Sequence, residues 1–387
     1  MKQPRSTAHQ RSVIGPRGQR LAKIALAAAA LLSLSTHAAA QSYHFTDLGT
    51  LGGDFGVGYG INDAGQVAGG SFTTGDANFR ATLWNGTAPT VLGTLGGQDT
   101  QASGINNAGQ VVGSADTTDG STHATLWNGT TPTDLGTLGG SRSLATGINN
   151  AGQIVGYSNT SADTYSHATL WNGATATDLG TLGGTISQAY GINNAGQVVG
   201  FSYTTGDAEG RATRWDGTTA IDLGTLGGNY SEGRGINDAG QVVGMSLSTG
   251  NLYVRATLWN GTTATDLGTL GGTYGFANGI NNAGQAVGVS STTGDAAYDA
   301  TLWNGTSTID LNSFLSAGDV AAGWSLTQAN AINDKGWITG RADNNITGES
   351  HAFLLSVASV PEPETYALML GGLGLLGVAI RRKRRLS

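Results

Sequence analysis

The sequence Ala-Thr-Leu-Trp and its variants recur along the chain. The residue directly before the alanine differs among the copies and is histidine, arginine or aspartate, while the residues after it stay nearly constant. Imidazole and guanidinium groups hydrogen-bond to anions and hydroxyl groups, so a ring of them is a candidate site for a glycan or an anion. A solvated strand end is the simpler interpretation of the same position. The seven residues of this candidate ligand ring are Arg80, His123, His167, Arg211, Arg255, Asp299 and His351.

A second recurring group is the aspartate of Asp-Leu-Gly. General acid–base catalysis needs a close pair of carboxyl groups with separated pKa values. One aspartate per repeat instead favours a side chain that accepts hydrogen bonds within its own turn. We therefore predict a structural role and no catalytic residue for this set, which comprises Asp47, Asp134, Asp178, Asp222, Asp266 and Asp310.

Other kinds of catalytic or metal site find little support in the sequence. The chain has no cysteine, which excludes disulfides and thiolate chemistry. The three histidines of the candidate ring fall in separate repeats, so we expect no zinc site. Gly-x-Ser-x-Gly, His-Glu-x-x-His and the phosphate-binding P-loop are all absent, and no loop has EF-hand spacing. We expect neither a metal nor a cofactor.

These side chains are carried by an internal repeat. The motif Gly-Ile-Asn-Asn-Ala-Gly-Gln-Val-Val-Gly and its variants place an isoleucine at 61, 105, 148, 192, 236, 280 and 332. A fixed period of about 44 residues is typical of a solenoid, a propeller or a repeat array. Six repeats also have a tryptophan at the end of Ala-Thr-Leu-Trp or its variant, and together with 64 glycines this indicates tight turns and packed sheets rather than disorder.

Each repeat can be divided into four short strands. The first ends at Gly-Ile-Asn, the second is Gly-Gln-Val-Val-Gly, the third is Ala-Thr-Leu-Trp and the fourth precedes Asp-Leu-Gly. Asn-Gly after the third strand is a strong hairpin signal, which explains the Asn-Gly-Thr triplets better than glycosylation does. Four strands in 44 residues predict an all-β fold, a β-propeller, with a β-helix as the competing solenoid.

The two ends of the repeat region favour the propeller. The region begins with a lone fourth strand, residues 43–49, and ends with a third strand, residues 351–356. Pairing these two strands would complete a seventh blade and hide both edges. We therefore predict a seven-bladed β-propeller over residues 41–357. The connector at 310–330 is longer than its counterparts, and a closure segment is the simpler interpretation, with a binding lid as the alternative.

The first 40 residues have the pattern of a secretory signal peptide. Basic residues precede the apolar run Ile24–Ser35, and the small residues Ala38 and Ala40 stand at −3 and −1 before Gln41. We predict cleavage before Gln41. An uncleaved membrane anchor is the alternative.

The segment 358–387 has three parts that point to processing at a membrane. Pro361, Glu362 and Pro363 follow Val360, and an apolar run from Tyr366 to Ile380 comes next. As a helix this run reaches roughly 22 Å, and flanking residues can extend it toward the ~30 Å core of a bilayer. The positive-inside rule keeps the basic end cytoplasmic. That basic cluster is Arg381, Arg382, Lys383, Arg384 and Arg385.

The charge between the two termini excludes one class of partner. The formal charge of the whole chain is −7, but residues 41–360 contain 8 Lys+Arg and 24 Asp+Glu, a balance of −16. Such a surface repels phosphate backbones, so we expect no nucleic-acid partner.

Two resemblances to known families follow from these motifs. The elements DLGTLGG, GINNAGQVVG and HATLW, with the terminal GWSLTQANAIND and HAFLL, resemble the HAF family of extracellular repeats over roughly residues 43–356. The tail resembles the PEP-CTERM sorting signal of Gram-negative bacteria, which implies processing by an exosortase-type enzyme. An ordinary C-terminal anchor is the alternative. Together they imply export, an inner-membrane-anchored intermediate, and a final place at the cell surface or outside the cell.

The leading functional hypothesis is a non-enzymatic, exosortase-sorted protein of the cell surface or matrix, with extracellular polysaccharide as a partner. The alternative is a propeller lectin, or an enzyme acting on polysaccharide as a hydrolase or lyase. The alternative rests on analogy with other propellers.

Overall fold

Runs of β-branched and aromatic residues alternate with glycine-containing turns, and this pattern produces four strands in each repeat. The computed structural model describes residues 43–173 and 175–357, which belong to one compact unit. Within them the elements are β-strands and a few short helical turns. The all-β prediction is confirmed. The predicted signal peptide and the predicted membrane helix at 366–380 lie outside the described residues.

Two strands of each repeat flank its Asn-Ala-Gly or Asp-Ala-Gly turn. The first, here called the inner strand, is β2 (Gly52–Ile61), β6 (Gly96–Ile105), β10 (Gly139–Ile148), β14 (Gly183–Ile192), β18 (Gly227–Ile236), β22 (Gly271–Ile280) and β26 (Trp324–Ile332). The second is β3 (Val67–Thr73), β7 (Val111–Thr117), β11 (Ile154–Thr160), β15 (Val198–Thr204), β19 (Val242–Ser248), β23 (Ala286–Thr292) and β27 (Ile338–Asn344). We number the repeats 1 to 7 in this order.

The other two strands complete each sheet. The third is β4 (Phe79–Asn85), β8 (Thr122–Asn128), β12 (Ser166–Asn172), β16 (Gly210–Asp216), β20 (Val254–Asn260), β24 (Tyr298–Asn304) and β28 (Ser350–Val357). The outer strand is β5 (Ala88–Val91), β9 (Thr131–Asp134), β13 (Thr175–Asp178), β17 (Thr219–Asp222), β21 (Thr263–Asp266), β25 (Ser307–Asp310) and, in repeat 7, β1 (Tyr43–Gly49).

Short helical segments lie in two kinds of connection. Five 3₁₀ turns join the second and third strands of repeats 1 and 3 to 6, and they are η1 (Thr74–Asp76), η2 (Ser161–Asp163), η3 (Thr205–Asp207), η4 (Thr249–Asn251) and η5 (Thr293–Asp295). The long connector before repeat 7 contains η6 (Leu311–Phe314) and α2 (Ala317–Ala321).

The hairpin predicted at Asn-Gly is present, with the glycine in the loop and the asparagine still in the strand. In repeat 5, Asn260 pairs with Thr263 and Gly261 has a φ of 61°. A left-handed residue at the first of two loop positions is the type II′ arrangement, which matches the twist of the flanking strands. Glycine adopts this conformation without steric cost.

A second glycine is required by close backbone approach. Gly200 lies opposite Ala189, next to a register shift in β14. A Cβ atom there would lie 1.9 Å from the carbonyl oxygen of Gln188, closer than any real contact. The last glycine of the Gly-Gln-Val-Val-Gly motif therefore keeps the inner and second strands together at an irregular point in the ladder.

Tryptophan fills the interface between successive sheets. Trp127 of repeat 2 is fully buried and packs in one cluster with Ala68, Ala81 and Leu92 of repeat 1. The same packing recurs around the structure, and Leu355 takes the tryptophan position in repeat 7. Because each sheet buries its apolar face against the next, the core is a series of inter-sheet clusters.

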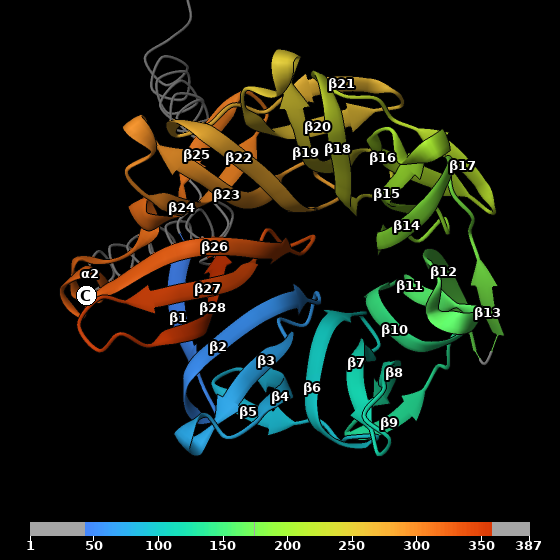
Figure 1. Cartoon of the computed structure of the whole chain (residues 1–387). Helices are drawn as coiled ribbons and strands as arrows, with labels where there is room; N and C mark the ends of the chain where they lie inside the picture. Colours follow the sequence, from blue (N-terminus) through green and yellow to red (C-terminus); the bar gives the residue numbers. More distant parts are fainter. Residues whose placement is uncertain (1–42, 174, 358–387) are drawn as a thin grey trace, which may run out of the picture. The chain divides into compact units, whose positions relative to one another are not determined.

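The sheets follow one another around a central axis and return to the start. Each inner strand contacts the inner strand of the next repeat, and β26 of repeat 7 contacts β2 of repeat 1. Figure 1 shows the sheets of this unit arranged in chain order with their inner strands toward the centre. The turns after the inner strands lie at one end of the axis, which we call the turn end. The connections between second and third strands lie at the opposite end, the loop end.

The predicted pairing of the two ends of the repeat region is present. Strand β1 pairs antiparallel with β28, with Tyr43 opposite Val357 and Thr46 opposite Leu354. The connector between repeats 6 and 7 packs on this pair, since Phe314 lies 4.6 Å from Tyr43 between ring centroids. Trp324 similarly lies 6.1 Å from Phe45. These contacts support the interpretation of the 310–330 segment as a closure element.

Candidate functional site

The turn end is built from a local network repeated in each Asn-Ala-Gly-Gln turn. In repeat 3 the Oδ1 atom of Asn149 accepts hydrogen bonds from the backbone amides of Ala151 (3.1 Å) and Gln153 (3.0 Å). Its amide nitrogen donates to Oε1 of Gln153 at 2.8 Å. The buried asparagine thereby fixes its own turn, because a side-chain oxygen here replaces a backbone acceptor.

The same asparagine also joins its repeat to the next. The Asn149 amide nitrogen donates to the backbone carbonyl oxygen of Asn193 at 3.1 Å. Equivalent bonds run through all repeats, and Asn333 closes the circle on Asn62 at 2.9 Å. We call this set the asparagine ring; it consists of Asn62, Asn106, Asn149, Asn193, Asn237, Asn281 and Asn333.

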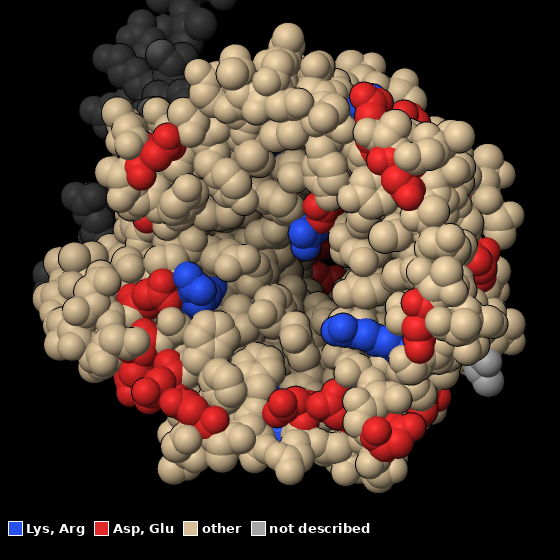
Figure 2. All heavy atoms as spheres, in the orientation of Figure 1, with Lys and Arg blue, Asp and Glu red and all other residues tan. Residues whose placement is uncertain are grey.

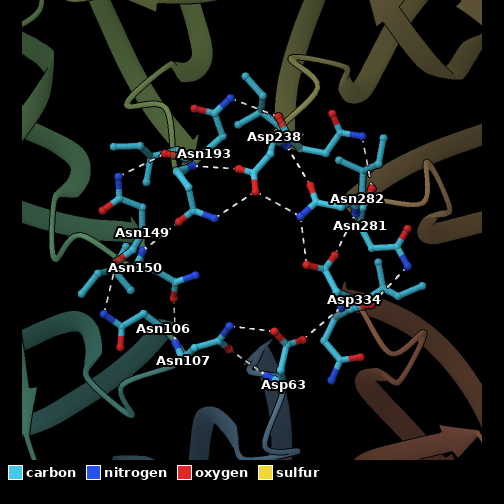
Figure 3. Close-up of a pocket in the computed structure, with 18 of the residues that line it drawn as sticks. Asp63, Asn106, Asn107, Asn149, Asn150, Asn193, Asp238, Asn281, Asn282 and Asp334 are labelled. Atoms are coloured by element: carbon cyan, nitrogen blue, oxygen red, sulfur yellow. Dashed lines mark hydrogen bonds between the residues drawn. The ribbon is translucent and has the colours of Figure 1, made fainter.

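A second ring surrounds the axis at the following residue of each turn. Here each backbone N–H donates to the side-chain Oδ1 of the next repeat, and the chain of bonds closes between Asp334 and Asp63 at 3.2 Å. Figure 3 shows these side chains converging on a common centre. We call it the Asn/Asp ring, and its members are Asp63, Asn107, Asn150, Asn194, Asp238, Asn282 and Asp334.

Residues of both rings and the motif isoleucines line a pocket with a volume of about 220 Å³. Burial raises the pKa of Asp238, but hydrogen bonds from Asn194 and Asn282 outweigh it, so the pKa of this carboxyl lies below its usual value. Among the residues described, no group of three or more His, Cys, Asp or Glu side chains is placed to hold a metal ion. Because both rings hydrogen-bond internally, we interpret the turn end as a structural closure.

Further along the axis the inner strands line a second cavity of about 330 Å³. Most of its lining comes from the residues two and four positions before the motif isoleucine. We call it the axial chamber, and it is lined by Tyr59, Gln101, Ser103, Leu144, Thr146, Tyr157, Tyr190, Arg234, Asn278, Gln328 and Asn330.

Arg234 is the charged residue of the axial chamber. Its guanidinium carbon lies 4.6 Å from the ring centroid of Tyr190 and 4.9 Å from that of Phe276. Its Nε atom lies 2.5 Å from Oε1 of Glu232, a contact with ion-pair distance but without hydrogen-bond alignment. Glu232 is only 6 % exposed, so this pair holds a carboxylate inside the ring by charge rather than by solvation.

The chamber tyrosines are neutral donors and acceptors. Burial raises the pKa of Tyr190, and the nearby Glu232 carboxylate raises it further. Burial likewise raises the pKa of Tyr59 and Tyr157 above the usual value, although positive charges nearby act in the opposite direction. The chamber therefore offers phenol, amide, hydroxyl and guanidinium groups together with aromatic faces.

Part of the basic charge of this otherwise acidic ring lies near the axis, while Arg80, Arg211, Arg214 and Arg255 lie on third strands. Figure 2 shows Lys and Arg atoms around and within a central hollow, with Asp and Glu atoms mostly farther out. Arg142 and Arg234 lie close enough to Tyr157 for their charges to lower its pKa against the effect of burial. Arg341 lines an adjacent cavity with Gln328 and is paired with Asp343 at 3.1 Å.

The predicted ligand ring is not brought together. Its members lie one per sheet on the third strand, and most of them pair with the Asp-Leu-Gly aspartate of the same sheet. The distances are 2.8 Å for His123–Asp134, 2.7 Å for His167–Asp178, 2.8 Å for His351–Asp47, 3.8 Å for Arg211–Asp222 and 3.7 Å for Arg255–Asp266. Each of these five side chains therefore has an aspartate partner within its own sheet.

The two remaining members differ because their sheets differ. Repeat 1 has Val91 in place of the aspartate, and Arg80 there donates to the carbonyl of Gln98. In repeat 6 burial raises the pKa of Asp299, and the like charge of Asp310 raises it further.

The turn capping predicted for the recurring aspartates is present. Oδ1 of Asp178 accepts a hydrogen bond from the backbone amide of Gly180 at 2.8 Å. The same bond from the residue two positions on occurs at the other members, Asp47, Asp134, Asp222, Asp266 and Asp310. Each carboxylate thus caps its own turn.

The axial chamber was missed by the sequence interpretation. The signal was present in the repeats, because the residue before Gly-Ile-Asn is Tyr, Ser, Thr, Tyr, Arg and Asn in repeats 1 to 6. Such variation beside a motif that recurs in every repeat indicates positions where the fold does not require a particular side chain.

The predicted sorting residues, Val360 to Pro363 and the basic cluster from Arg381 to Arg385, lie outside the described residues, as do Ala38, Ala40 and Gln41. Within the part of the chain that is described, no helix is both long and apolar enough to span a membrane.

Comparisons with known proteins address the fold and the tail separately. A protein assigned as TolB from Agrobacterium tumefaciens is 14 % identical, with a TM-score of 0.41 over 54 % of this chain and 79 % of its own. TolB from Acinetobacter baumannii is 14 % identical, with a TM-score of 0.39 over 54 % of this chain and 51 % of its own. At these values neither likeness bears on function.

A search of curated proteins found no significant match. The tail gives a specific result: residues 359–385 match the PEP-CTERM protein-sorting motif. The chain therefore carries the sorting signal of an extracellular protein that an exosortase processes.

Proposed function

We propose that the chain is a non-enzymatic protein of the cell surface or extracellular matrix, built as a seven-bladed β-propeller of HAF-type repeats. The observation that carries the proposal is the PEP-CTERM motif at residues 359–385. Export, an anchored intermediate and release or surface display follow from that signal. The Gram-negative envelope and the identity of the final compartment belong to the proposal.

The contacts within the ring support a scaffold rather than a catalyst. The recurring aspartates cap turns and pair with histidine or arginine on the neighbouring strand. Both rings at the turn end are closed chains of hydrogen bonds between successive repeats. A carboxylate held in this way is fixed against its own turn and the neighbouring strand, whereas acid–base catalysis needs a close pair of carboxyl groups with separated pKa values.

The test of the proposal concerns processing. Pro361 and Pro363 restrict the backbone of the residues before them and favour an extended segment that a processing enzyme can bind. In a host with the sorting enzyme, the parent is expected to lose its tail and to reach the surface or the medium. The double variant Pro361→Ala/Glu362→Ala is expected to stay intact in the membrane fraction.

The measurement is cell fractionation with intact-mass determination, and Leu386→Ala, just beyond the matched motif, serves as control. Equal tail removal in parent and double variant contradicts a role for the triplet. A tail retained in the parent points to an ordinary anchor.

A second candidate is a propeller lectin or an enzyme acting on polysaccharide. The axial chamber favours it, because aromatic and amide side chains line a cavity of ligand size. A panel of hydrolase and lyase assays on the processed protein separates the candidates, since any turnover excludes the non-enzymatic proposal.

A further inference from the structure

We propose that the axial chamber is a saccharide-binding site, with Tyr59 and Tyr190 as ligand-contacting residues. The proposal goes beyond the sorting signal and does not depend on it, since it concerns what the folded ring binds wherever the ring resides.

The first support is variation within a constant frame. The asparagine ring holds the same residue in all repeats, whereas the chamber position two residues before the isoleucine holds Tyr59, Ser103 and Thr146 in the first three repeats alone. The backbone at these positions is equivalent, so the fold accepts a large or a small side chain there. Repeat proteins often bind ligands on a surface where the repeats differ, so these positions are candidates for ligand contact.

The second support is that a buried ion pair lies at the chamber without an evident structural need. Glu232 is buried beside Arg234, and Arg234 is held between the rings of Tyr190 and Phe276. Burying a carboxylate is unfavourable until a partner offsets the lost hydration. The equivalent positions in repeat 2 are Gln101 and Ser103, so the ring closes without such a pair.

The third support is the combination of groups. A sugar ring presents hydroxyl groups at its edge and C–H groups on its faces. Tyrosine hydroxyls and the Gln101 amide complement the edge, and the ring of Tyr59 complements the faces, whereas Arg234 covers one face of Tyr190. The 330 Å³ of the chamber lies at the lower end of the range for small-molecule sites, about 300–1,000 Å³, so we expect one or two sugar residues to enter.

The charge near the axis bears on which saccharides enter. The ring as a whole is acidic, which disfavours a highly charged polyanion. Arg142 and Arg234 place positive charge beside Tyr157, and Glu232 balances that of Arg234. A saccharide with an isolated carboxylate and a neutral saccharide share the same ring chemistry, and the experiment below distinguishes them.

The test uses the full processed protein with cello-oligosaccharides as neutral probes and oligogalacturonates as carboxylate-bearing probes. Binding is measured by isothermal titration calorimetry. Tyr59→Ser/Tyr190→Ser introduces the residue that repeat 2 already has at this position, so the fold is expected to persist. We expect at least one probe class to bind the parent, and the double variant to bind about tenfold more weakly or less.

A second variant makes the opposite change and replaces a small chamber residue with a tyrosine. Ser103→Tyr introduces the residue of repeats 1 and 4 and fills the chamber, so it is expected to abolish binding while the melting temperature stays near that of the parent. Tyr165→Ser removes an exposed tyrosine away from the chamber and is the matched control. The proposal is overturned if neither probe class binds the folded parent. It is also overturned if Ser103→Tyr and the folded double variant both bind like the parent.

Failure of the tail to be processed would contradict the proposed sorting and leave the binding result unaffected. Loss of binding with normal processing would contradict only the chamber.

Discussion

At the scale of single residues, the buried asparagine of each turn stabilises the ring, because its side chain hydrogen-bonds both within its own turn and to the next repeat. Asn149 uses its oxygen to hold its own turn and its nitrogen to hold the next repeat. Asn150, its neighbour in the chain, is exposed and uses its oxygen to accept a hydrogen bond from the Asn107 backbone amide. The two residues have the same chemistry and very different surroundings.

This contrast gives a direct test. Asn149→Asp keeps the acceptor but removes both donated bonds and places a carboxylate against the Asn193 carbonyl and Gln153 Oε1. We expect a loss of about 3 kcal/mol in the free energy of unfolding. Asn150→Asp makes the same change where other repeats already have aspartate, and we expect about 0.5 kcal/mol or less. Chemical denaturation measures both, and equal losses would contradict the assigned role of the asparagine ring.

Asp299 provides the second residue-scale prediction. Asp299 faces Asp310, so two carboxyl groups meet in this sheet. In five other sheets the equivalent residue is a histidine or an arginine, which pairs with the aspartate opposite it. The raised pKa of Asp299 means that the folded state disfavours the charged form. Asp299→Asn should therefore raise the free energy of unfolding at pH 7 by about 0.2–1 kcal/mol, a small effect because water screens this partly exposed pair.

The sign of the pH dependence follows from the direction of the shift. The destabilisation exists above the folded pKa of Asp299 and fades as pH falls toward the value for the unfolded chain. Thermal unfolding between about pH 4 and pH 8 should show the gain of Asp299→Asn shrinking at low pH. The exposed Asp54→Asn is the control, and a gain that grows on acidification would refute the assignment.

The role of a polar residue could be predicted from the sequence where its hydrogen-bond partner is close in the chain. The turn capping by Asp178 was predictable, because the carboxylate and the amide it accepts from are two residues apart. The pairing of His167 with Asp178 was not, because it requires the register between the third and outer strands. The ligand ring was expected at the same residues because that register cannot be read from the sequence.

At the scale of elements, glycine allows two strands to approach closely because it has no Cβ atom. Gly200 faces the Gln188 carbonyl, whereas Gly206 in η3 has a φ of 73° and has open space where a side chain would begin. The chain already has Ala162 at the equivalent of Gly206, at a φ of 65°. The two glycines are therefore required for different reasons and to different extents.

We expect Gly200→Ala to cost about 3 kcal/mol, because β14 and β15 must separate to admit the methyl group. Gly206→Ala should cost about 1 kcal/mol, the strain of a left-handed alanine. Thermal and urea unfolding compare the two variants. A smaller loss for Gly200→Ala than for Gly206→Ala would contradict the close approach.

Strands and hairpins were predictable because their signals are contiguous in sequence. The irregular parts were not. The bulge beside Gly200 depends on two strands meeting, and the 3₁₀ turns depend on side chains such as Asp207, which binds the start of its own inner strand through the amide of Thr185.

At the scale of the whole ring, the pairing of β1 with β28 completes the last sheet. Tyr43 of β1 and Leu355 of β28 are both buried, in one cluster with the core of repeat 7. The sequence predicted this pairing because the region begins with an outer strand and ends with a third strand. It did not lead to the chamber, because the variable residue before Gly-Ile-Asn can be placed on a common axis only when the ring is known to close.

Deleting residues 43–49 should leave the edge of β28 exposed and remove part of that cluster. We expect a markedly lower melting temperature, or association through the free edge. His44→Ala, an exposed change in the same strand, is the control. Differential scanning calorimetry and light scattering measure both effects, and a monomer that melts like the parent would argue against closure by β1.

The closing pair also sets an order of events in time. Strand β1 is among the first parts of the ring to be synthesised and its partner β28 is the last, since Asp47 and His351 are 304 positions apart in the sequence. Repeats 1 to 6 can form and stack while synthesis continues, since each contacts mainly its neighbours. Strand β1 must wait, with its hydrogen-bonding groups unpaired, until residue 357 has emerged. Folding is therefore completed only after the whole repeat region has left the machinery that makes or exports it, and a chain stalled before that point keeps an open strand edge.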